Sequence, residues 1–340
     1  MVPIRITKRI TNPQPSELEG LDERLAADEA LTVQFDGPTY TDELLRQLDS
    51  LAAVFRGLLE IRFYGHEETP FDGSTLEKIP RVTNLSVDCL PRASKIEALA
   101  QLGCLEQLSL GVFDLAETNV LAFPNLASLR MLTLGETKTK AIELSHLARF
   151  SKLEWLRLVG HTQGISALQA MPALETLALD RMGKQTSFGF VSEMQALRSL
   201  SLLLGGRASI AEIGPPHLRE LEIHRVSGLN DLGELARFPE LASLIVHNQP
   251  RLERVAFSPD NAQLEAVHFF DCKSLSELPG LETLPRLRHL RLGTTALDAE
   301  ALLALKLPAS VEICALYTGK EREERRIQAA LAERGYKEFG

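Results

Sequence analysis

The sequence predicts an α/β solenoid, in which each short repeat adds one strand to a curved parallel sheet. Two observations support this fold class. Between Leu229 and Val246 apolar residues recur at every third position and then at every second. A spacing of three fits a 3₁₀-like turn with one buried stripe, and a spacing of two fits a strand with alternate side chains buried. The same turn-and-strand pattern recurs along most of the chain, whereas the 3.6-residue period of a helix bundle does not.

The strand part of the repeat is the phrase L-x-x-L-x-L, with Ile, Val or Phe allowed, and it occurs in 12 units that start 21 to 24 residues apart. The units begin at Leu58, Val82, Leu105, Leu129, Leu153, Leu174, Leu197, Leu218, Leu241, Leu264, Leu287 and Val311. The fourth unit is ambiguous, because its lead-in also allows a strand phrase that starts at Leu126. Leu132 would face outward in the Leu126 register, and Met131 would face outward in the Leu129 register.

These units resemble the leucine-rich repeat superfamily, whose period is 20 to 29 residues. Triplet-spaced apolar residues before the strand, often followed by proline, resemble the short-repeat, phosphatase-regulator-like type. The resemblance implies a horseshoe with a concave parallel sheet and a convex side of 3₁₀ turns, short helices or loops. One feature departs from the family: the Asn or Cys expected three residues after the strand phrase is present only at Cys272. The same position elsewhere holds His161, Met182, Gly205, Val226 and Gln249.

The two ends of the chain are predicted to cap the array. Residues 1–57 form the N-terminal cap, with strands expected at Ile4–Ile6 and Leu31–Phe35 and a helix over 41–56. Residues 58–317 form the repeat array, and residues 318–340 form a C-terminal cap around a helix from Glu321 to Arg334. Capped ends favour a monomer.

Composition limits the classes of function. The chain has 340 residues, and its net charge of −9 argues against nucleic acid as a partner. The N-terminus lacks a signal-like apolar segment, and no apolar run reaches the length of a membrane span. The four cysteines have no paired spacing, which fits free thiols in the cytoplasm.

The concave face is where a solenoid binds its partner, so the residues between the buried leucines are the candidate site. They are Met131, Trp155, Arg157, Asp180, Glu220, Glu222, His224, Ile245, His247, His268, Phe270, His289 and Arg291. Trp155 favours a contact role, since Trp and Arg are frequent in binding hot spots; the alternative is that its ring packs on its own neighbours. The histidines could bind a metal, but zinc ligands usually show tighter paired spacing. We therefore favour a protein-contact surface.

No catalytic motif is present: H-E-x-x-H, G-x-S-x-G and G-x-x-x-x-G-K-[ST] are all absent. The sequence thus predicts a non-enzymatic protein, without cofactor or metal, that binds a protein partner and neither nucleic acid nor membrane. Its Ala-, Leu- and Arg-rich composition suits a bacterial inhibitor or immunity-type protein that acts on a toxin or an enzyme. The alternatives are an effector that acts on host proteins and a metal-dependent enzyme that uses His247, His268 and His289.

Overall fold

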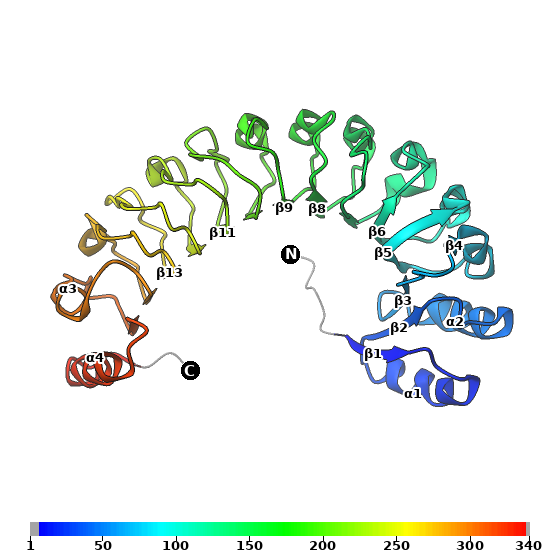
Figure 1. The fold of residues 1–340 in the computed structure, drawn as a ribbon, viewed down its shortest axis with the longest axis horizontal. Helices are drawn as coiled ribbons and strands as arrows, with labels where there is room; N and C mark the ends of the chain where they lie inside the picture. Colours follow the sequence, from blue (N-terminus) through cyan, green and yellow to red (C-terminus); the bar gives the residue numbers. More distant parts are fainter. Residues whose placement is uncertain (1–6, 338–340) are drawn as a thin grey trace. The chain divides into compact units, whose positions relative to one another are not determined.

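A computed structural model describes residues 7–337, and the chain divides into two compact units, residues 1–175 and 176–340. Each unit is a solenoid built on a parallel sheet, with helical turns on the opposite side of most repeats (Figure 1). The predicted fold class is therefore confirmed. No helix among the described residues is long and apolar enough to cross a membrane.

The strands of the first unit lie side by side in sequence order and pair in parallel, and the short β4 pairs with β5 away from this path. They are β1 (Lys8–Thr11), β2 (Leu31–Asp36), β3 (Leu59–Tyr64), β4 (Phe71–Asp72), β5 (Asn84–Ser94), β6 (Gln107–Asp114), β7 (Met131–Leu134) and β8 (Trp155–Val159). The strand expected at Leu31–Phe35 is present as β2, and it already belongs to the sheet. The strand expected at Ile4–Ile6 lies outside the described residues.

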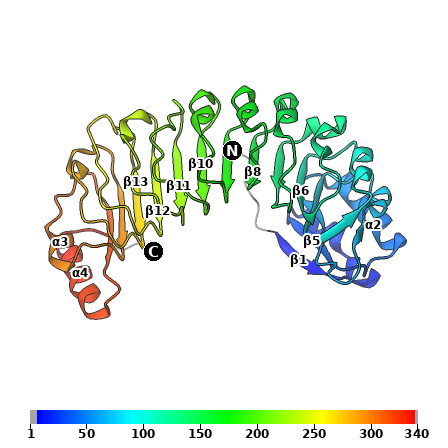
Figure 2. The same ribbon diagram turned by 45° about the horizontal axis from the view of Figure 1, so that its top comes forward.

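The strands of the second unit follow the same rule, each pairing in parallel with the next (Figure 2). They are β9 (Thr176–Asp180), β10 (Ser199–Leu203), β11 (Glu220–His224), β12 (Ser243–His247), β13 (Ala266–Phe270), β14 (His289–Gly293) and β15 (Ile313–Tyr317). The last unit, which the sequence marks only weakly, thus supplies a full strand.

Short 3₁₀ helices occupy the outer side of most repeats, as the triplet spacing predicts. In the first unit they are η1 (Pro15–Leu18), η2 (Gly73–Lys78), η3 (Ile96–Gln101), η4 (Val120–Ala122), η5 (Pro124–Ser128), η6 (Leu144–Arg149) and η7 (Ile165–Ala170). In the second they are η8 (Gly189–Glu193), η9 (Leu235–Arg237) and η10 (Leu281–Thr283). Within residues 7–337 the α-helices are α1 (Leu21–Ala26), α2 (Asp42–Val54), α3 (Ala299–Ala304) and α4 (Glu321–Glu333).

The stretch from Leu229 to Val246 shows why the two spacings give this fold. All seven of its periodic apolar side chains are at most 2% exposed. The spacing of three runs through the turns around η9, and the spacing of two coincides with β12. One sequence pattern therefore fills the core from both the outer and the inner side of a repeat.

The ambiguous fourth repeat adopts the Leu129 register. Leu132 and Leu134 are buried in β7, while Met131 is partly exposed on the other side of the strand. Leu126 is buried in η5, one turn earlier. The Leu126 alternative is wrong, because it would turn Leu132 out of the core.

The position that holds Asn or Cys in related repeats still satisfies backbone carbonyls here, with other residues. Nε2 of His161 lies 2.8 Å from the Gly135 carbonyl oxygen, and the Gln249 amide donates to the His247 carbonyl over 3.0 Å. The Cys272 thiol lies 3.7 Å from the Val246 carbonyl oxygen. His161 and Cys272 thus contact a carbonyl of the preceding repeat, and Gln249 contacts one within its own.

A second ladder follows the strands of the second unit. The residue after each of β9 to β14 has a positive φ, and its N–H donates to the carbonyl that ends the next strand. The residues are Arg181, Leu204, Arg225, Asn248, Asp271 and Thr294. This left-handed turn stops each strand at the same height, so equivalent side chains on the sheet lie in line.

The terminal helices pack as the sequence predicts for their apolar faces. Thr41 caps α2 by accepting a hydrogen bond from the Leu44 N–H, and Ile327 and Leu331 of α4 are buried. The domain boundaries at 57 and 318 remain predictions.

Candidate functional site: the inner sheet face

The inner face of the second unit's sheet is arranged in three columns, because all its strands pair in register. The first column holds Thr176, Ser199, Glu220, Ser243, Ala266, His289 and Ile313. The second holds Ala178, Ser201, Glu222, Ile245, His268, Arg291 and Ala315. The third holds Asp180, Leu203, His224, His247, Phe270, Gly293 and Tyr317. Neighbours within a column are about 4.8 Å apart, the spacing of paired strands.

The third column forms a stack of rings. The His224 and His247 rings are stacked with centroids 4.6 Å apart, and the His247 and Phe270 rings are stacked at 5.5 Å. The column continues past Gly293 to Tyr317, whose ring centroid lies 6.3 Å from that of Phe270. We call His224, His247, Phe270 and Tyr317 the ring stack. All four side chains are partly exposed, so the stack is a surface rather than a core.

Gly293 makes room for the stack. A Cβ atom at this position would lie 2.6 Å from a ring carbon of Phe270, well inside contact distance. The Phe270 ring therefore occupies the space that a side chain at 293 would need. The Arg291 guanidinium lies over the same ring, 4.5 Å from its centroid, and 6.0 Å from that of Tyr317. Such cation–π contacts hold rings and guanidinium in a fixed arrangement.

The opposite end of the stack is fixed by a carboxylate. Nε2 of His224 lies 2.7 Å from Oε1 of Glu222, and the Ser201 hydroxyl donates to the other Glu222 oxygen over 3.1 Å. Glu222 therefore orients the first ring of the stack. Glu220, on the same strand, is exposed to solvent.

Three basic side chains gather beside the ring stack, on β13 and β14. His268 is paired in register with Arg291, and His289 lies two residues before Arg291 on the same face. We call His268, His289 and Arg291 the basic patch. Burial, together with charge repulsion from Arg291, His289 and His247, lowers the pKa of His268 to about 4. Burial, together with His224, also lowers the pKa of His247.

Of the other predicted site residues in this unit, Ile245 fits the prediction and Asp180 does not. Ile245 is partly exposed in the second column, between Glu222 and His268. Asp180 lies in the third column beside Leu203, but its side chain is only 4% exposed. The expectation that Asp180 is presented to a partner is wrong, because the alternation of side chains fixes direction and not what covers them.

In the first unit, Met131, Trp155 and Arg157 lie on the inner face as predicted. Met131 and Trp155 are paired in register, and Arg157 follows on the same face of β8. All three are partly exposed. They form a smaller patch than the ring stack.

The first unit also carries a polar network that the sequence did not indicate. Glu60 accepts hydrogen bonds from the hydroxyls of Thr32 (2.7 Å) and Ser86 (2.5 Å). Arg62 donates to Asp88 over 2.8 Å and to Gln34 over 3.2 Å. We call these six residues the polar network. Thr32, Gln34 and Ser86 are at most 7% exposed, and the Arg62 and Asp88 side chains are 18% and 22% exposed, so the network is largely sheltered from solvent.

Tyr317 was also missed by sequence reasoning. The signal was available, because Tyr317 follows the last buried leucine of the weak twelfth repeat at the same offset as Phe270 in its own repeat. Extending the third column by two strands would have found it.

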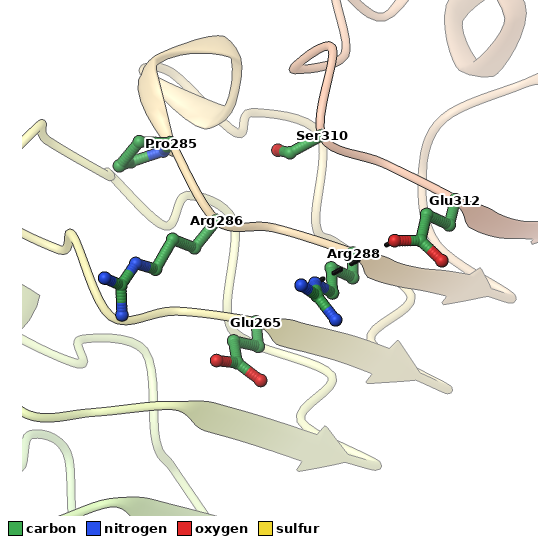
Figure 3. Close-up of a pocket in the computed structure, with 6 residues that line it drawn as sticks. All are labelled: Glu265, Pro285, Arg286, Arg288, Ser310 and Glu312. Carbon is green, nitrogen blue, oxygen red and sulfur yellow. Dashed lines mark ion pairs between the residues drawn. The ribbon is translucent and has the colours of Figure 1, made fainter.

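An open groove of about 420 Å³ lies at the N-terminal ends of the strands, between the segments that precede β14 and β15. Figure 3 shows Arg286 and Arg288 alternating with Glu265 and Glu312 along it. Arg288 lies 3.9 Å from Glu312, and Arg286 donates to Gln263 over 2.6 Å. These charges largely balance one another, so the groove offers no single chemistry to a ligand.

The part of the chain that is described shows no metal centre, and two of its four thiols are buried. Within residues 7–337, no three or more His, Cys, Asp or Glu side chains are grouped to hold a metal ion. Cys272 and Cys314 are buried, and burial raises the pKa of their thiols to about 11 and about 12. Protonated, buried thiols of this kind are poor nucleophiles.

Comparison with known proteins finds likeness in structure only. No protein-family model and no curated protein matches the chain. An internalin from Listeria monocytogenes is similar at 16% identity and a TM-score of 0.48, over 98% of this chain and 87% of that one. A leucine-rich repeat protein from Leptospira interrogans is similar at 14% identity and 0.45, over 98% and 100%. Toll in its complex with Spätzle from Drosophila is similar at 11% and 0.45, over 84% and 47%.

Proposed function

We propose that this chain is a non-enzymatic recognition protein of the short leucine-rich repeat type, which binds a protein partner on its inner sheet face. The observation that carries the proposal is the ring stack. Four ring side chains lie in one column over five consecutive strands, in contact with one another and partly exposed. Exposed aromatic groups held in a rigid array gain free energy when a partner covers them, and they cost little conformational entropy.

The surroundings of the stack support binding rather than catalysis. Arg291 and Glu222 each hold a ring in place, and Ile245 adds an apolar contact in the neighbouring column. Aromatic side chains and arginine at the centre, with charged groups such as Glu220 around them, is the composition of a protein-binding hot spot. Trp155 and Met131 provide a second, smaller patch of the same kind in the first unit.

The biological setting belongs to the same proposal. We propose a bacterial, cytoplasmic protein of the inhibitor or immunity type, which neutralises a toxin or regulates an enzyme by covering it. The four free cysteines support a reducing compartment. The partly exposed array of rings supports action by occlusion.

The test is co-expression of the tagged chain with the product of the neighbouring gene, followed by gel filtration. A stoichiometric complex is expected for the wild type, and Phe270→Ala should weaken it by about 2 kcal/mol or more, roughly 30-fold. Phe113→Ala is the matched control, because Phe113 is also an exposed phenyl ring (52%) but lies in the first unit, off the ring stack. A complex that survives Phe270→Ala unchanged would contradict the proposed binding face. Failure of that gene product to bind would remove the immunity role.

A further inference from the structure

The charges beside the ring stack indicate which kind of partner surface fits this face. The basic patch places two imidazoles and one guanidinium on adjacent strands, with no carboxylate on the inner face of β13, β14 or β15. The titratable groups that face it from the surrounding elements are His247 on β12, Tyr317 on β15, Glu222 and His224 on β11, and Asp271 after β13. Of these, Glu222 is already engaged by His224 and Ser201.

The members of the basic patch repel one another when protonated. Arg291, His289 and His247 all oppose the protonation of His268 by charge. An anion placed among them would convert this repulsion into attraction. An anion is therefore the ligand that gains most from this arrangement.

The surroundings of the basic patch favour one class of ligand. The chain carries a net charge of −9, so its surface as a whole repels acidic molecules. The basic patch is a local exception, and it adjoins a column of rings that an apolar or aromatic side chain can cover. One arginine with two imidazoles suits one or two carboxylates, whereas a nucleic-acid backbone needs many fixed cations.

We propose, as an extension of the proposed function, that the partner presents an acidic and aromatic segment to this face. Its carboxylates lie against His268, His289 and Arg291, and its aromatic side chains pack on the ring stack. Because His268 is largely neutral at neutral pH when free, binding of a carboxylate beside it favours its protonation. Recognition of this segment is thus electrostatic at the patch and apolar at the stack.

The test uses two labelled pentapeptides, one alternating glutamate with tyrosine and one alternating lysine with tyrosine. Binding to the full chain is measured by fluorescence anisotropy at low salt, and the histidine ring signals are followed by NMR. The acidic peptide should bind at least tenfold more tightly and shift the rings of His268 and His289. Arg291→Glu should reverse the preference, and the milder Arg291→Gln should remove it without reversal.

Arg251→Glu is the matched control, since it changes the net charge equally at an exposed arginine away from the sheet face. Equal losses in Arg251→Glu and Arg291→Glu would overturn the inference, because binding would then follow overall charge. Preference for the basic peptide, tighter binding of a thymidine octanucleotide, or no binding of the acidic peptide would overturn it too. In each case the proposed function would still be judged separately, by the complex that depends on Phe270.

Discussion

The two units share one backbone pattern but use their inner sheet faces differently. In the first unit Glu60 and Arg62 sit at the centre of a polar network whose hydrogen-bonding groups satisfy one another. In the second unit the third column instead holds rings that contact one another and stay partly exposed. A satisfied polar network gains little from a partner, because each new hydrogen bond replaces an existing one. Exposed rings gain whatever apolar area the partner removes from water.

The repeat thus determines where each inner-face side chain lies. The residues between the buried leucines determine what that face can contact. Each strand delivers three side chains to the inner face at fixed heights, in both units alike. Polar residues at these positions on β2, β3 and β5 satisfy one another. The rings and basic groups on the second unit's strands are the ones that we propose to meet a partner.

The largest expected effect separates core from surface within one strand. Phe269 is fully buried and Phe270 lies on the inner face, one residue apart in β13. Phe269→Ala should lower the free energy of unfolding by about 3–5 kcal/mol, whereas Phe270→Ala should cost only about 1 kcal/mol, the value of its ring contacts. Urea unfolding monitored by circular dichroism measures both. Equal losses would mean that Phe270 is part of the core, and the second unit's face would then not be a binding surface.

The alternation of buried and inner-face side chains along each strand can be predicted well from the sequence. A period of two fixes which residues face inward, so Phe270, Ile245 and the four histidines could be placed on one face and even in columns. Tyr317 was not predicted because the motif of its repeat is degenerate, with Cys314 in place of the central leucine. A residue of the site can therefore be predicted from sequence only where the strand that carries it is recognised.

The rest could not be predicted because it depends on side-chain neighbours rather than on direction. Asp180 has the predicted direction yet is covered. The polar network begins on β2, which precedes the recognisable repeats, so no column could be drawn through Thr32 and Gln34. Ring contacts such as that of His224 with His247 need the strand register and the rotamers together.

A second prediction tests whether the polar network is structural. Arg62→Met removes the donor shared by Asp88 and Gln34 and leaves both acceptors without it. We expect a loss of about 1–3 kcal/mol in unfolding free energy, with partner binding unchanged. Arg46→Met is the control, because its ion pair with Asp42 is exposed and should be worth less than about 0.5 kcal/mol. If Arg62→Met weakened partner binding as much as Phe270→Ala, both faces would contact the partner.

A third prediction tests the geometry of the ring stack without removing a ring. Gly293→Ala places a methyl group where the Phe270 ring now lies, so the ring must move away from Tyr317. We expect about tenfold weaker partner binding, ~1.4 kcal/mol, measured by isothermal titration calorimetry. Gly103→Ala, where a Cβ meets no atom within 4 Å, is the control. Unchanged binding in Gly293→Ala would show that the rings act individually rather than as a preorganised stack.

The smallest expected effect is a pH dependence. As the pH falls, the stability of the chain should decrease, whereas its affinity for the acidic peptide should increase. The pKa of His268 is about 4 in the folded chain and about 6.5 when unfolded, so above pH 6.5 both states are neutral and its contribution to stability is fully present. As the pH falls from 6.5 towards 4 the unfolded state takes up the proton first, and stability declines by an amount on the order of 1 kcal/mol once solvent screening is allowed for. A bound carboxylate raises the pKa of His268, so affinity for the acidic peptide should rise between about pH 6.5 and 5, above the range where glutamate itself is protonated. Thermal melts and anisotropy titrations over this range measure the two trends, and His268→Gln should flatten both. Stability and affinity that fall together would show that the basic patch does not receive the carboxylate.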